Sequence, residues 1–327
     1  MNGSIEYENK YQRKIDGLLL ANNKLNGFYA FIGDKSISTI YNYLLHINEF
    51  LNYIDKPLQY VNLDDFSGYM MKIQKNQKGE KSTSSYRIVA YSALKKYGNY
   101  LVASGIIPNN PMNYIDRPKA VDSQKTIEKR EVGYLEKKEI SKYIKAVKTS
   151  NGKTNRVNTI WQERDLAIIT LFLVTGIRCS ALIKIDMSDI NFEEKKLIVT
   201  DKEDKVIIYD LTDDTLEIIK NWINKRQSIL NNKEEDALFI SRQKNRICQM
   251  SVYNLVNKYA VNINGKHITP HKLRATYGTQ LYNATGDIYF VQKCMNHNSP
   301  KTTETYIRGV KNTSKKASDI MTNLLNK

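Results

Sequence analysis

Six residues in the second half of the chain carry side chains that suit the cleavage of a phosphodiester bond without a metal ion. They are, in chain order, Arg178, Lys202, His271, Arg274, His297 and Tyr306. Attack on phosphorus spreads negative charge over the non-bridging oxygens, and two guanidinium groups can bind that charge in a forked geometry. An ammonium group can protonate the departing oxygen, and a tyrosine oxygen can act as a covalent nucleophile. Together these groups favour phosphoryl transfer, whereas each one alone would more often be a solvated charge or a packed ring.

Two predicted helix starts position four of these side chains. A Thr-Pro pair at 269–270 and a Ser-Pro pair at 299–300 suit the N-cap and the first residue of a helix. Residues three apart on a helix are neighbours, and a residue six positions further along lies about two turns away. The side chains placed in this way are His271 and Arg274 in the first helix, and Tyr306 in the second, with His297 just before it.

Two other motifs do not predict a site. The sequence GKT at 152–154 resembles part of a phosphate-binding loop, but that loop needs a glycine where this chain has Val147. His267 and His271 are four residues apart, as helical metal ligands are, yet Pro270 begins a helix that leaves His267 outside it. No carboxylate or third histidine lies nearby, so we expect no metal site and no cofactor.

The charge of the chain favours a polyanionic partner. Its 327 residues include 50 Lys and Arg against 34 Asp and Glu, a formal net charge of +16. Such an excess attracts nucleic acid before any specific contact forms. No run of about 18 apolar residues suggests a membrane span, and the first residues lack the apolar core of a signal peptide, so we expect a cytoplasmic protein. The three cysteines, at 179, 248 and 294, have no CxxC spacing and are interpreted as reduced thiols.

The length and the apolar patterns predict two domains joined by a linker. Ile37, Ile40, Leu44, Ile47, Leu51 and Ile54 keep the spacing of one helix face, and helical patterns follow at 63–75 and 83–104. Prolines and polar residues then interrupt regular structure. The predicted parts are an N-terminal segment and possible arm at 1–27, a helical DNA-binding domain at 28–112, a linker at 113–133 and a catalytic domain at 134–327.

The second domain is predicted to be mostly helical with one small antiparallel sheet. Two β-rich runs around a charged turn at 195–210 indicate a hairpin, which a strand at 237–241 is expected to join. The predicted helices are 136–148, 162–175, 213–230, 251–262, 271–284 and 288–296.

Four motifs resemble the catalytic signature of the tyrosine recombinase, or phage integrase, family. They are TGIRCSAL, the DKEDK turn, HKLR, and MNH followed nine residues after its histidine by Tyr306. The stretches STIYNYLLHINEFLNYI and YRIVAYSALKKYGNYLVASGIIPNNPM are similar to the core-binding domain of that family, so the resemblance spans roughly residues 28 to 310. It implies a mainly α, two-domain, C-shaped clamp around duplex DNA, built from a helical SAM-like core-binding domain and a mixed α/β catalytic domain.

The resemblance also implies a role for each residue. Arg178 and Arg274 would hold the scissile phosphate, and Tyr306 would attack it to leave a 3′-phosphotyrosyl link. Lys202 would protonate the departing 5′-hydroxyl, and the two histidines of the set would position the phosphate and assist proton movement. Because the phosphotyrosine keeps the bond energy, the reaction needs neither ATP nor metal.

The chain departs from the family pattern in three places. In one of them, a mild change, the common leucine-glycine-histidine reads Met295-Asn296-His297. The family usually has an acidic residue three positions after the first arginine, where this chain has Ala181, so support from a carboxylate must come from elsewhere or be missing. The hairpin turn reads Asp201-Lys202-Glu203 where glycines usually flank the lysine. Lys205, in the same turn, is a competing candidate for the acid.

The function predicted from these observations is site-specific cutting and rejoining of DNA. The implied partners are double-stranded DNA target sites and three further copies of the chain, in a tetramer on two duplexes. An accessory directionality protein is a further candidate partner. The segment after Thr313 either docks on a neighbour or is a frayed tail. Two alternatives stay open: a type IB topoisomerase-like enzyme that nicks and reseals one duplex, and a non-catalytic basic DNA-binding protein. The acidic residues do not favour a metal-dependent transposase.

Overall fold

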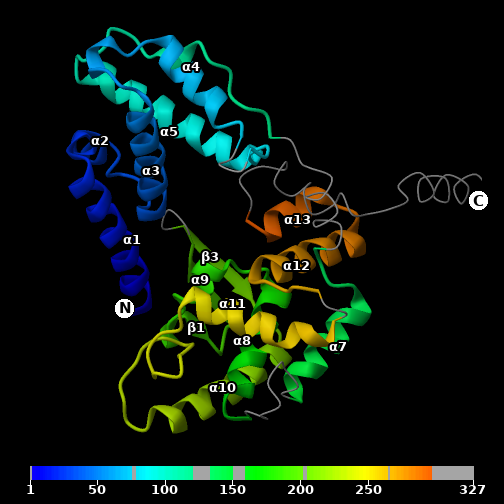
Figure 1. Cartoon of the computed structure of the whole chain (residues 1–327). Coiled ribbons are helices and arrows are strands. Elements are labelled where there is room, and N and C mark those ends of the chain that lie inside the picture. The colour runs from blue at the N-terminus through cyan, green and yellow to red at the C-terminus, as the bar shows by residue number, and fades with distance from the viewer. Residues whose placement is uncertain are drawn as a thin grey trace, which may run out of the picture. The chain divides into compact units, whose positions relative to one another are not determined.

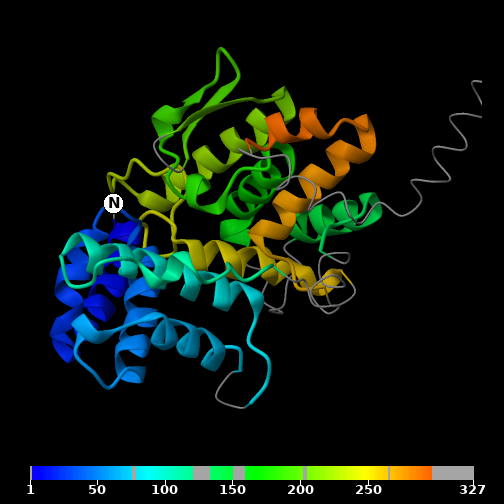
Figure 2. The ribbon, with the colours of Figure 1, turned by 90° about the horizontal axis from the view of Figure 1, so that it is seen from above.

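The chain forms two compact units, each with its own hydrophobic core (Figures 1 and 2). The computed structural model describes residues 2–75, 79–120, 133–149, 159–201, 205–263 and 266–296. One unit comprises Ser4–Gln124, and the other comprises Lys125–Lys327 with Met1–Gly3. The boundary between the units falls within the predicted linker, of which residues 121–132 lie outside the described residues.

The regular elements of the first unit, within its described residues, are helices. Its α-helices are α1 (Asn2–Ala21), α2 (Asn26–Phe31), α3 (Ile37–Tyr53), α4 (Leu63–Lys72) and α5 (Ser84–Ala103), with short 3-10 turns at Asn23–Leu25, Leu58–Tyr60 and Pro111–Asn113. The predicted apolar face of α3 is confirmed, because its Ile40, Leu44, Ile47 and Leu51 are all buried. Residues 1–27 contribute to the same core, in which Ile15 is fully buried.

Several aromatic side chains pack against one another in the core of this first unit. The Phe50 ring lies 4.7 Å from that of Phe66, and the Phe28 ring meets Tyr97 edge-on at 5.1 Å. The first pair joins α3 to α4, and the second pair joins α2 to α5. The helices α3 and α5 lie side by side in both ribbon views (Figures 1 and 2). Aromatic pairs of this kind add to the stabilisation from burial alone.

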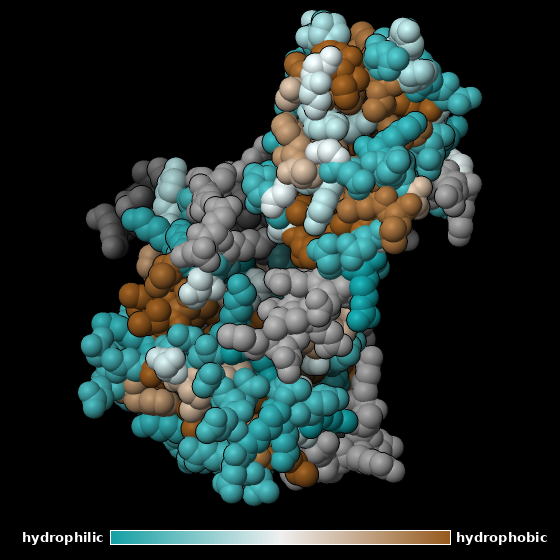
Figure 3. All heavy atoms as spheres, turned by 90° about the vertical axis from the view of Figure 1, so that its left-hand side faces the viewer, coloured by the Kyte–Doolittle hydropathy of each residue, from teal (hydrophilic) through white to brown (hydrophobic). Residues whose placement is uncertain are grey.

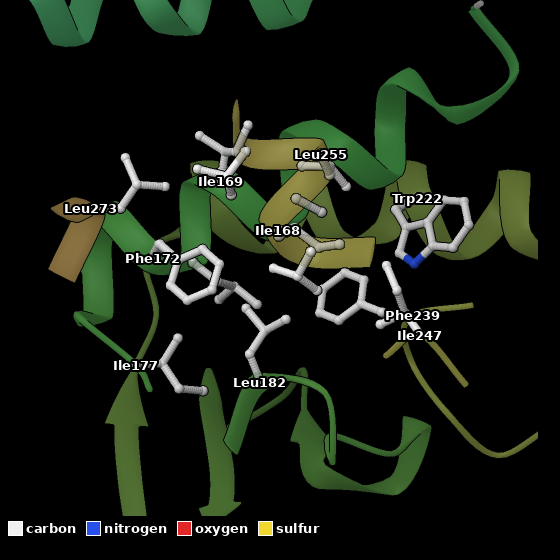
Figure 4. Packing of buried hydrophobic residues seen from close by; sticks show 14 of the residues in the cluster. Ile168, Ile169, Phe172, Ile177, Leu182, Trp222, Phe239, Ile247, Leu255 and Leu273 are labelled. Carbon is white, nitrogen blue, oxygen red and sulfur yellow. The ribbon is translucent and has the colours of Figure 1, made fainter. Parts of the chain in front are cut away.

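The second unit is built around α8. Its α-helices are α7 (Lys137–Lys148), α8 (Gln162–Thr175), α9 (Cys179–Leu182), α10 (Asp213–Leu230), α11 (Gln249–Lys258), α12 (Pro270–Thr285) and α13 (Ile288–Cys294). The sequence of α8 is apolar on nearly all sides, which suits a helix surrounded by others. In Figure 4, Ile168, Ile169 and Phe172 of α8 lie between Leu273 of α12 and Trp222 of α10.

Three antiparallel strands form the sheet of this unit, in the order β1-β2-β3. They are β1 (Ile190–Asn191), β2 (Lys196–Thr200) and β3 (Val206–Asp210). The predicted hairpin at 195–210 is therefore confirmed, with Ile198 opposite Ile208. Alternate residues Leu197, Val199 and Ile207 are buried, as a sheet with one covered face requires.

The predicted strand at 237–241 does not join this sheet, and that expectation is wrong. Ala237 to Ile240 are buried, but their backbone groups bond elsewhere. Leu238 donates its main-chain N–H to Ile185, and its carbonyl accepts a 2.8 Å hydrogen bond from the Trp222 indole. The carbonyl of Ala237 accepts from Arg226 Nε at 3.0 Å. Side chains of α10 thus satisfy the groups that a sheet neighbour would otherwise bond.

The predicted class, mainly α with a small antiparallel sheet in the second unit, is confirmed. Hydrophilic residues cover much of the face seen in Figure 3, and hydrophobic residues appear there as separate patches. No helix in the described part of the chain is long and apolar enough to cross a membrane.

Candidate active site

The turn after α8 places the first predicted catalytic residue. Thr175 donates from its hydroxyl to the main-chain oxygen of Leu171 and accepts from the N–H of Ile177 at 3.2 Å. Between them Gly176 adopts left-handed backbone angles, with φ 61°, that favour glycine. A Cβ on Gly176 would lie 2.3 Å from a ring carbon of Tyr277, so the close approach of α12 also requires glycine. Arg178 follows directly as the N-cap of α9.

Arg178 is held by two contacts on its guanidinium group. Its Nη1 forms an ion pair with the Oδ2 of Asp201, at the end of β2. Its Nη2 donates to the main-chain oxygen of Asn296 at 3.4 Å. The Arg178 side chain is 30% exposed, whereas that of Asp201 is 4% exposed. The carboxylate is therefore buried more deeply than the arginine side chain, part of which is exposed.

Arg274 lies on the first turns of α12 and is anchored to the backbone. The predicted N-cap is confirmed, since Thr269 accepts from the N–H of Lys272 at 3.3 Å and Pro270 begins the helix. Arg274 is 5% exposed and donates from Nη1 to the main-chain oxygen of Gly176 and from Nη2 to that of Met295. Gly176 lies two residues before Arg178, so Arg274 is bonded to the turn that carries Arg178. Met295 and Asn296 are adjacent, so both guanidinium groups donate to this one segment of chain.

Tyr209 on β3 is a further member of this cluster. Burial raises its pKa, and the nearby Asp201 carboxylate acts in the same direction. Arg274 and Arg178 act in the opposite direction, as does a hydrogen bond with Asn296. The charges of both arginines and of Asp201 all affect the pKa of this one phenol. Tyr209, the two arginines and Asp201 therefore lie at one site.

His271 lies three residues before Arg274 on α12, and its side chain is exposed in part. Partial loss of hydration lowers its pKa below the ordinary value of 6.5, and the charge of Arg274 lowers it further. The imidazole is therefore mostly neutral at pH 7 and able to accept a proton or a hydrogen bond.

The other predicted catalytic residues, Lys202, His297 and Tyr306, lie outside the described residues. Lys205, the competing candidate, is described and exposed, and its main-chain oxygen accepts a 2.9 Å hydrogen bond from the N–H of Asp201. Sequence reasoning did not select Asp201 as a partner of Arg178. Two features of the sequence could have indicated this partner: a carboxylate directly before Lys202, and the absence of the family's usual acidic residue at Ala181.

The three cysteines lie in the second unit. All three are free thiols and partly buried. Burial raises the pKa of Cys179 to about 12, and the neighbouring Cys248 adds to this rise, so this thiol is not a ready nucleophile. Within the described ranges, no group of three or more His, Cys, Asp or Glu side chains could hold a metal ion.

The sequence matches a known family over more than half of its length. Residues 133–312 fit the model of the phage integrase family. The chain belongs to this family of tyrosine recombinases. The resemblance noted from the four motifs is thereby confirmed.

Curated relatives include several tyrosine recombinases named XerC. The XerC of Alcanivorax borkumensis is 29% identical over 66% of this chain and 66% of its own length. That of Caldanaerobacter subterraneus is 31% identical over 76% of this chain and 65% of its own length. This chain thus spans slightly less than two thirds of these two relatives. The match to the XerC of Roseiflexus is longer, with 23% identity over 87% of this chain and 88% of that protein.

Solved structures of recombinases share the fold. The XerH recombinase in a post-cleavage complex with a palindromic difH substrate has a TM-score of 0.68 and 18% identity, over 87% of this chain and 79% of that one. A lambda integrase dimer bound to a core site has a TM-score of 0.61 and 18% identity, over 86% of this chain and 93% of that one. These likenesses confirm the predicted fold class, a helical unit followed by a mixed α/β unit.

Proposed function

We propose that this protein is a site-specific recombinase that cuts and rejoins duplex DNA through a 3′-phosphotyrosyl intermediate. The observation that carries the proposal is the convergence of the Arg178 and Arg274 guanidinium groups on one cluster. Arg274 is bonded to the turn that carries Arg178, and both groups donate to the adjacent residues Met295 and Asn296. Family membership supports the same reaction. The formal net charge of +16 supports DNA as the partner.

In the proposed reaction the two arginines bind the scissile phosphate. A guanidinium has five N–H donors, so Arg178 can bind Asp201 and Asn296 and still donate to a phosphate oxygen. Arg274 is fixed by two main-chain oxygens, so little reorganisation accompanies the build-up of charge on phosphorus. The backbone anchors therefore preorganise the positive charge that the transition state requires.

The covalent step exchanges one ester oxygen for another. The Tyr306 oxygen forms a bond to phosphorus as the bond to the 5′-oxygen breaks, and Lys202 gives that oxygen a proton. The phenol loses its proton toward His271 and His297, of which His271 has the lowered pKa that suits an acceptor at pH 7. A 5′-hydroxyl of another strand reverses the step and restores the tyrosine. The number of phosphate ester bonds is unchanged, so no high-energy cofactor is consumed.

The proposed partners are two DNA duplexes and further copies of the chain. The related structures were solved with DNA, XerH on difH and lambda integrase as a dimer on a core site, which supports DNA binding here. We assign DNA binding to the helical domain at 28–112 as well as to the catalytic domain at 134–327. The proposed assembly is a tetramer acting in the cytoplasm, with the segment after Thr313 docking on a neighbouring copy and a directionality protein as an optional partner.

A nicked suicide substrate tests the chemistry. Cleavage opposite the nick lets a short strand diffuse away, so the protein should be trapped as a covalent DNA adduct, in EDTA as well as without it. Tyr306→Phe should abolish the adduct while DNA binding survives. Tyr289→Phe, which changes a tyrosine that is 66% exposed on α13, is the matched control and should react normally. An adduct that persists in Tyr306→Phe would place the nucleophile elsewhere.

Recombination between two plasmids that carry the target site tests the second half of the proposal. A recombinase should join the two plasmids into one product. Relaxation of supercoils without any joined product would instead favour the type IB topoisomerase-like alternative. DNA binding without either activity would favour the non-catalytic alternative.

A further inference from the structure

Asp201 is a buried carboxylate with a defined place in the candidate site. It is 7% exposed and follows the last residue of β2. Its backbone is fixed, because its N–H donates to Lys205 across the hairpin turn. Its Oδ2 forms the ion pair with Arg178, while its Oδ1 is buried and has no hydrogen-bond partner among the described residues. Arg178 is therefore the cation that compensates this buried charge.

The helix that begins at Arg178 supplies no carboxylate of its own. The four residues of α9 are Cys-Ser-Ala-Leu, and Ala181 is 2% exposed within the hydrophobic core of the unit. An arginine side chain has several rotatable bonds and loses considerable freedom when it is held in one geometry. The group that restrains Arg178 from the protein side therefore comes from the β2–β3 hairpin instead of α9.

We propose that Asp201 is a positioning residue that orients the Arg178 guanidinium for the scissile phosphate. This inference rests on the proposed function. The side chain of Asp201 is 4% exposed and that of Arg178 is 30% exposed, so the carboxylate lies on the protein side of the guanidinium. A carboxylate that occupied the place of the phosphate would instead be exposed to solvent in front of the arginine. The pair thus leaves part of the Arg178 side chain exposed while its carboxylate partner is buried.

The same ion pair links two parts of the catalytic machinery. Asp201 directly precedes Lys202 in the chain, and Lys202 is the proposed acid. The contact between Asp201 and Arg178 therefore joins the end of β2 to the turn that carries the first arginine. In this chain a carboxylate stands where the family usually has a glycine, and Ala181 stands where the family usually has an acid. Asp201 compensates for the missing acid from a different element.

Cleavage of the suicide substrate at saturating DNA tests this role. Asp201→Asn keeps the size of the side chain but removes its charge. We expect adduct formation to slow by about 10- to 100-fold, because a misplaced arginine loses transition-state contacts. DNA affinity should change little. Asp201→Glu should recover part of the rate. Asp213→Asn, at an exposed ion pair with Lys195 at the start of α10, is the matched control and should leave the rate unchanged.

A second substrate separates positioning from a purely structural role. A neutral methylphosphonate at the scissile position develops less negative charge and depends less on guanidinium groups. The deficit of Asp201→Asn should therefore shrink on this substrate. A structural defect would lower the rate on both substrates equally, which would contradict the proposal.

The remaining outcomes are also decisive. A rate for Asp201→Asn equal to or above that of the unaltered protein would show that the carboxylate does not position Arg178, and an increase would indicate competition with the phosphate. If Asp201→Asn and Asp201→Gly both fail to fold, the carboxylate serves stability and the proposal is wrong. Absence of an adduct with the unaltered protein would contradict the proposed function instead.

Discussion

Arg274 donates from Nη1 to the main-chain oxygen of Gly176, two residues before Arg178. The second arginine of the site is thus bonded to the turn that carries the first. Its Nη2 donates to Met295, next to Asn296, whose main-chain oxygen accepts from Arg178. The separation of the two guanidinium groups is therefore set by backbone atoms, which move less than side chains.

Gly176 is predicted to be intolerant of a side chain. In Gly176→Ala the left-handed backbone and the contact with Tyr277 both oppose the new Cβ, so we expect a loss of more than about 2 kcal/mol in the free energy of unfolding. Gly286, the C-cap of α12, has φ 70° and nothing within 4 Å of its added Cβ. Gly286→Ala should cost only about 1 kcal/mol, from the backbone alone. Urea denaturation measures the free energy of unfolding of both variants. Equal losses would contradict the prediction that the contact with Tyr277 adds to the cost at Gly176.

Asp165 is predicted to stabilise the catalytic unit through a buried polar network. The side chain is 2% exposed and accepts from Arg164 at 2.8 Å, from the Tyr259 hydroxyl at 2.8 Å and from Lys258 at 3.4 Å. Asp165→Asn leaves buried cationic donors uncompensated, so we expect a loss of about 3 kcal/mol. Tyr259→Phe removes one neutral donor and should cost about 1 kcal/mol. Thermal and urea unfolding measure both losses in the free energy of unfolding. A larger loss for Tyr259→Phe than for Asp165→Asn would contradict the prediction.

His271 is predicted to titrate below the ordinary value of 6.5. Partial burial and then the Arg274 charge disfavour the protonated imidazole, so its pKa is lowered and protonation requires a more acidic solution. Arg274→Gln should raise this pKa without restoring the ordinary value, because the burial remains. Histidine NMR titration of the free protein measures both values. A pKa for His271 at or above 6.5 in the unaltered protein would contradict this prediction.

The two lysines of the hairpin turn are predicted to differ in chemical rescue. If Lys202 is the acid, Lys202→Ala should cleave slowly, and a bridging 5′-phosphorothiolate, whose leaving group needs no proton, should restore the rate. Lys205 is exposed and described, and Lys205→Ala should change the rate little. Single-turnover cleavage of both substrates measures the effect. Rescue of Lys205→Ala but not of Lys202→Ala would transfer the role of acid to Lys205.

Local patterns in the sequence were sufficient for helices such as α3 and α12 and for the hairpin, but they did not predict α1 or α9. The spacing of Ile40, Leu44 and Ile47 and the Thr269-Pro270 cap predicted elements that the structure contains. These signals depend on residues within a few positions of one another, so no knowledge of the packing is needed to interpret them.

The sequence alone also determined the family, the basic charge and the types of groups that a phosphodiester reaction needs. Only the tertiary structure decided the contacts that hold those groups: Asp201 as the partner of Arg178, and the backbone at Gly176 as the anchor of Arg274. It also decided that Ala237–Ile240 bond outside the sheet. These contacts join residues far apart in the chain, and their formation depends on how the helices and the hairpin pack, which no local spacing records.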